Sequence, residues 1–529
     1  MTAKRPKTYN SWYKIIIYIG ILSISTYYIY YRIFKTLPLE LRPVDIVFAL
    51  LILIVEILEA FEFFIYFRNN LLYKKKSPKT PRVDEKKLGE VDIFIATLNE
   101  EDELLEGTLK ACKRLNYPNK VHVYLCDDGE REHLKDLAEK YGANYLGRTT
   151  HLCAKAGNYN YALKHSSSPY IAIFDADMRP KKNFLLETMP FFVKRKKLGF
   201  VQTPQSFRNP DIFQARFSKK MPCEQDYFYK YIQLARNNVN STILCGTNCV
   251  ISRQALKEAG GFSQASIAED VATGMIIESK GYRGIAISKE LAYGETIDSY
   301  SAFLKQRSRW GRGCIQTAKA YDILRLKGLN LRQKLDYIVA INYWYFGFRR
   351  LLFMTLPLLF VFFNIIAIEA DLKVFIPLFL AQYLLKRFII DALERNHRSA
   401  TWSKIYELIQ APYLAVVTIK EFLGFSNKKF VVTPKNRPNK HSTLDYIMLA
   451  IHFILLLISG AALALAIYKS QLENFEIYAI PIIWIFVNLC YLLAAVTFDL
   501  RDSTRTNYDV KAKKRYGLGS FISIIWRKK

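Results

Sequence analysis

The sequence predicts a polytopic α-helical membrane protein with a doubly wound α/β domain inserted between its second and third membrane spans. Six apolar stretches are each close to the roughly 20 residues that a helix needs to cross a bilayer. Between the second and third stretches, short apolar runs alternate with helical patterns, as in α/β domains. The 529 residues are 51% hydrophobic and 14% aromatic, which excludes a disordered chain and a small disulfide scaffold.

The predicted spans divide the chain into membrane and non-membrane parts. The first span is longer than the apolar core of a signal peptide and precedes no small-residue cleavage site, so we expect it to stay in the membrane. The six spans are residues 12–34, 44–68, 343–368, 372–391, 443–467 and 474–497. The resulting parts are residues 1–70 with two spans, the α/β domain at 88–298, an interfacial helix at 299–325, two spans in 343–391, an interfacial segment at 402–441, two spans in 443–497 and a basic tail at 498–529.

The charge of the chain indicates its orientation. Lys and Arg number 76 against 47 Asp and Glu, a formal net charge of +29. These basic residues gather in the N-terminal segment, the 391–441 loop and the tail, which lie on the same side as the α/β domain. The positive-inside bias therefore predicts a plasma-membrane protein with a cytoplasmic α/β domain, in contact with lipid headgroups. Membrane topology accounts for the charge, so we expect no nucleic-acid partner.

The cysteines do not suggest a metal or disulfide framework. The chain has eight cysteines and no CxxC pair, and all but Cys490 lie between the second and third spans. We therefore expect reduced thiols, without zinc or disulfides.

Polar residues follow the predicted strands of the α/β domain. The strands are residues 91–97, 121–126, 170–174, 200–202 and 242–250. Strands of such sheets place ligand groups at their carboxyl ends. The candidate groups are Thr97 and Glu100 after the first strand, Asp127 and Asp128 after the second, and Asp175 and Asp177 after the third.

Asp175 and Asp177 form a DxD pattern that could hold a divalent cation. Hard carboxylate oxygens suit Mg²⁺ or Mn²⁺, which would join them to the phosphates of a ligand. In an arbitrary loop the same pattern is a solvated turn, but here it ends a strand near Asp127 and Asp128. Four acidic groups at one sheet edge repel one another unless a cation or donors are present, and Lys155 is a candidate donor.

Two later segments carry further candidate groups. Glu269 and Asp270 begin a predicted helix, where a carboxylate is either a general base or an acid that complements the helix dipole. Gln306, Arg309 and Trp310 lie on an amphipathic helix at the membrane surface. They either anchor that helix among headgroups or bind a diphosphate leaving group and a stacked sugar.

These motifs, in this order, resemble those of a known enzyme family. The pairs Asp127–Asp128 and Asp175–Asp177, the triplet 268–270 and the segment 306–310 are similar to the D, DxD, TED and Q(Q/R)xRW signature of processive family 2 glycosyltransferases. The family includes cellulose, chitin and hyaluronan synthases, and the resemblance covers residues 88–445. It implies a GT-A (Rossmann-like) catalytic domain held against a transmembrane channel. Ala268 stands where the family has Thr, which removes a hydroxyl but leaves Asp270 in place.

Further segments resemble the cellulose branch of that family. Residues 154–158 around Lys155 are similar to its HAKAGN element, residues 202–205 and 209–211 to the segment before its interfacial helix, and residues 245–248 to its acceptor loop. Residues 430–435 resemble its FxVTxK gating loop, which closes over the bound nucleotide; without the resemblance they are a polar linker. The resemblance thus implies acceptor residues Cys245, Gly246 and Thr247 and gating residues Phe430, Val432, Thr433 and Lys435.

The resemblance implies inverting, processive synthesis of a β-glucan from UDP-glucose, coupled to its export. Asp270, beside Glu269, is the expected base, and Asp175 and Asp177 are the expected metal ligands. The remaining expected roles are nucleotide-sugar binding by Thr97, Glu100, Asp127, Asp128, Lys155, Asp175, Gln306 and Arg309, acceptor binding by Trp310, and channel lining by Tyr343, Trp344, Tyr345 and Phe346, which an interfacial aromatic belt explains equally well.

Several alternatives remain open at this point. The donor sugar could be that of a chitin or hyaluronan synthase, and the linkage could be β-1,4, β-1,3 or mixed. A polyprenyl-phosphate glycosyltransferase needs neither the QxxRW motif nor the gating loop, and a silent transporter needs none of the acidic motifs. The tail after residue 498 is too short for a β-barrel cyclic-di-GMP sensor, so any regulation is expected from a separate subunit.

Overall fold

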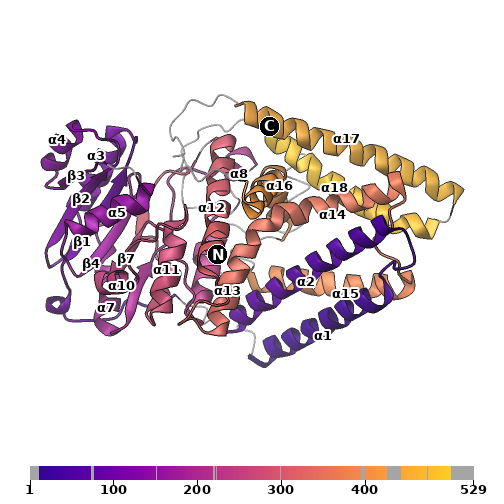
Figure 1. Ribbon diagram of the computed structural model, residues 1–529, viewed down its shortest axis with the longest axis horizontal. Coiled ribbons are helices and arrows are strands. Elements are labelled where there is room, and N and C mark those ends of the chain that lie inside the picture. Colours follow the sequence, from indigo (N-terminus) through magenta and orange to yellow (C-terminus); the bar gives the residue numbers. More distant parts are fainter. Residues whose placement is uncertain are drawn as a thin grey trace, which may run out of the picture.

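The computed structural model describes residues 11–501, apart from 73–76, 150–151, 218–220, 222, 298, 395–399, 426–441 and 474. The α/β domain forms one end of the molecule and the long helices form the other, with α12 and α13 between them (Figure 1). The expected α/β domain and helical part are therefore both present.

The α/β domain is built on a mixed sheet. Its described strands are β1 Val91–Thr97, β2 Val121–Asp127, β3 Asn144–Gly147, β4 Tyr170–Asp175, β6 Leu198–Gln202, β7 Cys249–Ser252 and β8 Arg283–Ala286, in the order β3-β2-β1-β4-β7-β6-β8. Strands β3, β2, β1 and β4 are parallel, and β7 runs antiparallel to both β4 and β6. Thr97 pairs with Asp127, and the preceding Ala96 pairs with Asp175. The polar strand ends thus meet at one edge of the sheet, as the sequence predicted.

Short helices connect these strands, and a small ribbon accompanies the sheet. They are η1 Glu85–Lys87, α3 Asp102–Lys113, α4 His133–Lys140, α5 Ala154–Lys164, α6 Phe184–Thr188, α7 Pro190–Lys194, α8 Ile212–Arg216, η2 Phe228–Ile232, α9 Gln233–Arg236, α10 Arg253–Glu258 and α11 Glu269–Ser279, with the ribbon formed by β5 Arg179–Pro180 and β9 Ala292–Tyr293.

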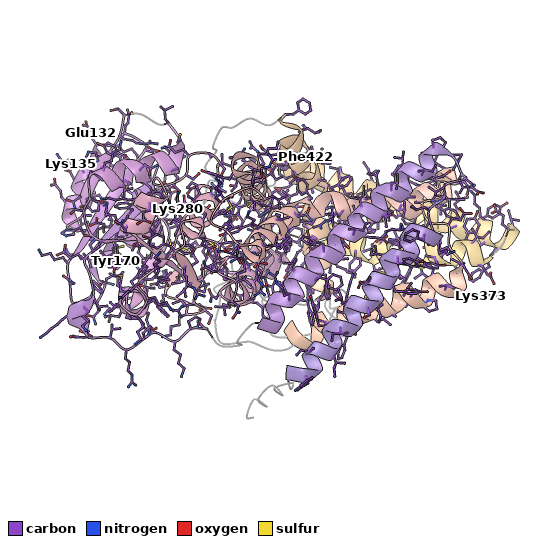
Figure 2. The ribbon with its side chains drawn as sticks, turned by 60° about the horizontal axis from the view of Figure 1, so that its bottom comes forward. Glu132, Lys135, Tyr170, Lys280, Lys373 and Phe422 are labelled. Atoms are coloured by element: carbon purple, nitrogen blue, oxygen red, sulfur yellow. The ribbon has the colours of Figure 1, made fainter. Side chains whose placement is uncertain are left out.

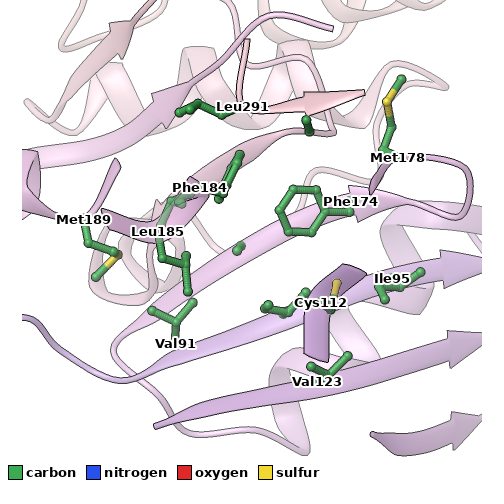
Figure 3. Close-up of a cluster of buried hydrophobic side chains, with 14 of the residues drawn as sticks. Val91, Ile95, Cys112, Val123, Phe174, Met178, Phe184, Leu185, Met189 and Leu291 are labelled. Carbon is green, nitrogen blue, oxygen red and sulfur yellow. The ribbon is translucent and has the colours of Figure 1, made fainter. Parts of the chain in front are cut away.

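Apolar side chains cover both faces of the sheet. On one face Val91, Ile95, Val123 and Phe174 pack with side chains that include Leu185 (Figure 3). On the other face Phe94, Ile173 and Tyr159 belong to a second cluster. Full burial of such a side chain contributes about 1.5–3 kcal/mol, so the strand ends are held on a rigid support.

The predicted strand 242–250 is mostly wrong. β7 begins at Cys249, and the preceding residues form an irregular loop. Gly246 and Asn248 have φ values of +64° and +53°, which an extended strand does not allow. The sequence analysis also missed β3 and β8, which are only four residues long.

The helical part consists of two long N-terminal helices and the helices that follow the α/β domain, with a short 3₁₀ helix, η3, among them. They are α1 Ser11–Lys35, α2 Pro43–Leu72, α12 Tyr300–Tyr321, α13 Leu331–Asn342, η3 Tyr343–Tyr345, α14 Phe346–Phe363, α15 Leu372–Glu394, α16 Ala400–Leu423, α17 Thr443–Leu472 and α18 Phe475–Leu500. The span predicted at 343–368 ends earlier, because Asn364 adopts the left-handed conformation that terminates α14.

Four of the described helical stretches are long and apolar enough to cross a membrane: Ile15–Lys35, Leu331–Phe363, Thr443–Leu472 and Phe475–Leu500. The predicted second and fourth spans are present as α2 and α15, with 30 and 23 residues. Both carry charged residues inside the apolar sequence, including Glu59 and Glu62 on α2 and Lys386 on α15. Their crossing of the membrane stays a prediction.

The two ends of the molecule are joined by a shared core. Phe213 of α8, Phe303 of α12, Ile405 of α16 and Phe498 of α18 are all buried in one cluster. The Tyr300 hydroxyl also donates a hydrogen bond to the Ile409 carbonyl oxygen at 2.5 Å. The helix that carries the QxxRW segment is therefore fixed against both the sheet domain and the long helices.

Candidate active site

A large cavity lies between the carboxyl edge of the sheet and the long helices. Its volume is about 1010 Å³, and its wall includes residues of β1, β4, α11 and α12 as well as α2, α14 and α16. Enzyme sites are commonly concave, and those of open α/β sheets lie outside the carboxyl ends of the strands. This cavity is therefore the candidate active site.

The end of β1 shapes one part of the wall. Thr97 and Glu100 both line the cavity. A single carboxylate oxygen of Glu100, Oε2, accepts hydrogen bonds from the Thr97 hydroxyl at 2.7 Å and from the Leu98 backbone N–H at 2.8 Å. Glu100 thus fixes the turn after β1 from a position on the cavity wall.

The two aspartates after β2 have different positions. Asp128 lines the cavity and forms an ion pair with Arg148, whose Nη2 lies 2.8 Å from Oδ2. Asp127 is fully buried behind the wall. Its carboxylate accepts hydrogen bonds from Arg131 Nη2 at 2.9 Å and from the Tyr145 hydroxyl at 3.1 Å. In this structure Asp127 therefore shapes the loop, and of the two aspartates it is Asp128 that reaches the cavity wall.

The DxD aspartates face the cavity at the end of β4. Asp175 and Asp177 both belong to its wall, and Asp177 is 4% exposed. The Asp175 backbone N–H donates to Thr247 Oγ1 at 2.9 Å, and the Ala176 carbonyl oxygen accepts from Thr108 Oγ1 at 2.7 Å. These bonds hold the strand end so that both carboxylates project at the same edge.

Lys155 lies among these carboxylates at the start of α5. Its ammonium donates to Asp175 Oδ1 at 2.6 Å and to the Gly246 carbonyl oxygen at 3.0 Å, and it lies 3.9 Å from Glu269 Oε1. Burial disfavours the charge, but Asp175, Tyr159 and Glu269 outweigh it, so the pKa of Lys155 is raised well above its usual value. Lys155 thus supplies the positive charge that the sequence analysis assigned to it.

Glu269 and Asp270 begin α11, as predicted. Asp270 lines the cavity, and burial, reinforced by the charge of Glu269, raises its pKa to about 7. A carboxyl group with that pKa can accept a proton near neutral pH and return it afterwards. The Asp270 carboxylate also accepts a hydrogen bond from the Val271 backbone N–H at 2.8 Å in the first turn of α11, so it complements the helix N-terminus as well as lining the cavity.

Close packing fixes the position of this carboxylate. A Cβ atom on Gly246 would lie 2.8 Å from Asp270 Oδ2, and Gly246 also has a φ of +64°. A Cβ atom on Gly313 of α12 would lie 2.5 Å from the Cβ of Ala268. The small residues at 246, 268 and 313 therefore allow the loop before β7, the start of α11 and the helix α12 to meet.

The α12 residues Gln306, Arg309 and Trp310 all line the cavity. Arg307 between them is buried, forms an ion pair with Glu224 and places its guanidinium 4.2 Å from the centre of a Trp310 ring. Arg307 therefore holds Trp310 through a cation–π contact. Glu224 could not be predicted from the sequence, because nothing there links it to Arg307, 83 positions away.

The predicted acceptor loop lies partly on the cavity wall. Cys245 lines the cavity, and its backbone N–H donates to Gln202 Oε1 at 2.8 Å. Gly246 and Thr247 instead hold Lys155, Asp175 and Asp270 in place from behind the wall. The predicted gating residues Phe430, Val432, Thr433 and Lys435 lie outside the described residues.

Asp175 and Asp177 fit a divalent cation shared with a ligand. Among the described residues, no group of three or more His, Cys, Asp or Glu side chains is placed to hold an ion by itself. Mg²⁺ commonly uses one or two carboxylates and takes its other ligands from water and substrate phosphates. Two hard oxygen donors on a cavity wall match that use, and a cation there would compete with Lys155 for Asp175.

Aromatic side chains continue along the cavity beyond Trp310. Three of the four aromatic residues predicted to line a channel, Tyr343, Trp344 and Phe346, line this cavity. The ring of Tyr345 instead lies 6.1 Å from that of Phe422. The sequence analysis did not single out the further wall residues Tyr66, Tyr227, Phe228, Tyr229, Tyr337, Trp402 and Tyr406.

Comparisons with known proteins agree with this arrangement. The family model "Glycosyl transferase family group 2" matches residues 170–390. The "Cellulose synthase 1 catalytic subunit [UDP-forming]" of Komagataeibacter xylinus is 30% identical over 96% of this chain and 71% of its own length. The chain belongs to the cellulose synthase family of glycosyltransferases.

Membership of the cellulose synthase family establishes the chain as a glycosyltransferase with a GT-A domain. The "Cellulose synthase catalytic subunit [UDP-forming]" of Pseudomonas fluorescens (strain SBW25) is 29% identical over 80% of this chain. The chain spans 58% of that relative and 32% of the "Cellulose synthase 1" of Komagataeibacter xylinus.

Among solved structures, the mannosyltransferase PcManGT from Pyrobaculum calidifontis matches with a TM-score of 0.49 and 16% identity. The match covers 72% of this chain and 100% of PcManGT. The family assignment rests on the sequence matches.

Proposed function

We propose that this protein synthesises a β-glucan processively from UDP-glucose and passes the product into the membrane through the cavity. The observation that carries the proposal is the shared wall of that cavity. Asp270, the two DxD aspartates and Trp310 all line it, and it continues between α2, α14 and α16. Donor, base, acceptor and exit path would thus occupy one continuous space. The positive-inside bias supports a plasma-membrane protein whose α/β domain is cytoplasmic.

The proposed reaction is a single inverting displacement. An acceptor hydroxyl beside Trp310 attacks C1 of the donor sugar, so that the new C1–O bond forms as the bond from C1 to the diphosphate oxygen breaks. Asp270 accepts the hydroxyl proton during the attack. UDP departs with the electron pair of the broken bond, on the side where Lys155 and Arg309 can meet its charge.

The other wall residues orient the two substrates. Thr97, Glu100 and Asp128 hold the nucleoside part of the donor, and Gln306 and Arg309 approach the diphosphate from α12. Asp175 and Asp177 would hold Mg²⁺ or Mn²⁺, which neutralises the diphosphate charge when bound. Because the donor and the acceptor are held in line in one site, their reaction does not depend on a chance encounter in solution.

The test is to incubate the purified enzyme with UDP-glucose, UDP-N-acetylglucosamine or UDP-glucuronate in Mg²⁺ or Mn²⁺ and determine the linkage of any polymer. Asp322, on an exposed turn away from the cavity, provides the matched control Asp322→Asn for the variant Asp270→Asn. We expect a polymer from UDP-glucose alone, lost in Asp270→Asn and kept in Asp322→Asn. A polymer that needs UDP-N-acetylglucosamine identifies a chitin or hyaluronan type of synthase and refutes the glucan assignment.

A further inference from the structure

One face of α12 holds the loop that leads into α11. Figure 1 shows α12 between α11 and α16, and it contacts both helices. A Cβ atom on Gly313 would lie 2.5 Å from the Cβ of Ala268, so the two backbones meet closely there. One turn further along α12, the Thr317 hydroxyl lies 2.9 Å from the Ser266 hydroxyl. Residues four apart share one face of a helix, so both contacts fix the same loop.

The start of α11 depends on these contacts because its N-cap residue, Ala268, has no polar side-chain atom. An N-cap Ser, Thr, Asp or Asn would accept a hydrogen bond from the first turn of the helix. Ser266 acts nearby, since its hydroxyl oxygen accepts from the Ala268 backbone N–H at 3.2 Å. The Thr317 hydroxyl donates to the Gly313 carbonyl oxygen at 2.9 Å, so the Ser266 hydroxyl can donate to Thr317. The start of α11, and with it Asp270, is therefore placed from α12.

Gln316 joins this loop to a third helix. Its amide oxygen Oε1 accepts a hydrogen bond from the Ile267 backbone N–H at 3.1 Å, three residues before Asp270. Its amide nitrogen Nε2 donates to Glu421 Oε1 at 3.1 Å, near the end of α16. The two partners define the orientation of the amide, because a backbone N–H only donates and a carboxylate only accepts. Gln316 thus uses one end of its amide on each neighbour.

Glu421 is a fixed anchor for this amide. Its side chain is buried, and Arg312, one turn before Gln316, donates from Nε to Glu421 Oε2 at 2.9 Å. Lys319 donates to the carbonyl oxygens of Glu421 and Phe422 at 2.6 and 2.8 Å, which satisfies the end of α16. Figure 2 labels Phe422 at this end of the helix. The end of α16 is therefore held on α12, and Gln316 extends the attachment to the loop before α11.

The residues that Gln316 connects belong to the active site. Ile267 and Asp270 line the cavity from the loop and from α11, and Arg309 and Trp310 line it from α12. The hydrogen bond to Ile267 thus fixes the position of the proposed base relative to the helix that carries the proposed acceptor residue. An acceptor hydroxyl must lie within hydrogen-bond reach of its base as it attacks. The bond from Gln316 therefore bears on the transfer step.

We propose that Gln316 is a positioning residue for sugar transfer, which holds Asp270 at the distance from Trp310 that proton removal requires. It acts through the Ile267 backbone and takes its own position from Glu421. The inference rests on the proposed function and adds to the same site a residue that contacts neither substrate. Loss of the Gln316 amide should lower kcat and leave nucleotide binding unchanged, because the groups proposed to hold the nucleoside lie at the ends of β1 and β2.

The experiment compares variants of the full-length enzyme in lipid nanodiscs with UDP-glucose and Mn²⁺. Gln316→Met keeps the approximate size of the side chain and removes both hydrogen bonds. Gln254→Met on α10 is the matched control, since the exposed Gln254 amide also donates to a carboxylate, Glu258 Oε1, at 2.8 Å. The rate of UDP release at saturating UDP-glucose gives kcat, and calorimetric titration gives the affinity for UDP.

We expect Gln316→Met to lower kcat by about tenfold, because a catalytic group displaced by a fraction of an ångström loses much of its effect, with the affinity for UDP within about twofold of the unaltered enzyme. Gln254→Met should change neither quantity. A normal kcat in Gln316→Met overturns the proposal. A parallel loss of kcat and UDP affinity also overturns it, because it shows a general disturbance of the α/β domain.

An exchange of side chains tests the bond to Glu421. Gln316→Glu keeps an acceptor for the Ile267 backbone N–H but places two carboxylates against each other, so kcat should fall. Adding Glu421→Gln restores one amide and one carboxylate, and Arg312 then has a carboxylate four positions along its own helix. The double variant should return to within about threefold of the unaltered kcat. A double variant no faster than Gln316→Glu alone overturns the proposed bridge to α16.

A final comparison shows whether Gln316 acts through Asp270. In an Asp270→Asn background, Gln316→Met should lower the remaining rate by less than about twofold, because the group that it positions is already lost. A further tenfold loss in that background overturns the proposal. Failure of the proposed function is seen separately, before Gln316 is changed: the unaltered enzyme would form no polymer from UDP-glucose, or Asp270→Asn would keep full turnover.

Discussion

Charge is organised differently at the two ends of the cavity. At the sheet edge, carboxylates outnumber cations, and Lys155 contacts Asp175 and approaches Glu269. At the end among the long helices, Glu62 is paired with Arg349 and Glu407 with Arg350. An excess of carboxylates suits a substrate that brings a cation and a diphosphate, whereas balanced pairs suit a chain without charge. Under the proposed function, this contrast separates sugar transfer from product export along one space.

The same difference affects how the groups titrate. Asp270 has a pKa of about 7, because burial and the neighbouring Glu269 both disfavour its charged form. A carboxylate base with a raised pKa needs surroundings in which cations and hydrogen bonds do not fully offset its negative charge. The ion pairs among the long helices, Glu62 with Arg349 and Glu407 with Arg350, instead form a fixed polar surface.

The largest expected effect comes from removing the base. Asp270→Asn should lower turnover by at least roughly 10²-fold, as is typical for a lost general base, while UDP binding remains. The check combines the rate of UDP release with calorimetric titration of UDP and Mn²⁺. Equal losses of binding and turnover would instead make Asp270 a nucleotide-holding group.

The next effect concerns the cation at the DxD aspartates. Asp177→Asn should weaken the apparent affinity for Mn²⁺ by at least about tenfold, because one of two carboxylate ligands is lost. Synthesis at limiting Mn²⁺ should fall and recover partly at high Mn²⁺. Undiminished synthesis by the unaltered enzyme in excess chelator would contradict the metal assignment.

A smaller effect is expected in the pH profile. Asp270 acts as a base only when deprotonated, so kcat/KM should rise with pH through about 7 and level off above it. Lys155 lowers the pKa of Asp270, and Lys155→Met should therefore move this rise to higher pH. The position of the rise, rather than the maximal rate, is the quantity to compare. An unchanged position would show that Lys155 does not act on Asp270.

The smallest effect on turnover is expected far from the cavity. Asp92 is fully buried and pairs with Arg253 Nη2 at 2.7 Å. Asp92→Asn should reduce the stability of the α/β domain by about 3–5 kcal/mol, with turnover per folded molecule unchanged. Glu90→Gln, in the exposed pair with Lys120 beside the same strand, should change stability by less than about 1 kcal/mol. Thermal unfolding distinguishes the two.

Much of the sheet edge could be predicted from the sequence because it depends on local patterns. A buried parallel strand is a continuous apolar run, and a polar residue directly after it must lie at the carboxyl edge. This reasoning placed Thr97, Asp128, Asp175 and Asp177 correctly on the cavity wall. It could not show that Asp127 lies behind the wall, because that depends on where Arg131 and Tyr145 point.

Other features depend on contacts between distant segments. From the sequence, the loop before β7 could not be distinguished from a strand, because the positive φ values of Gly246 and Asn248 follow from their contacts. Arg307 was identified only as part of a motif, and its partner Glu224 comes from another segment. Glu59, Glu62 and Tyr66 were placed within a membrane span, and their common face became visible only with α14, α15 and α16 in position.

In the proposed function, one molecule extends one chain repeatedly along this cavity. The direct measurement is the length distribution of products at low conversion, with a large excess of a short soluble gluco-oligosaccharide acceptor over enzyme. Repeated extension by one molecule predicts long chains while most of the acceptor remains unextended, since the product stays in the cavity between transfers. A product population in which most acceptors have gained a single sugar would contradict it.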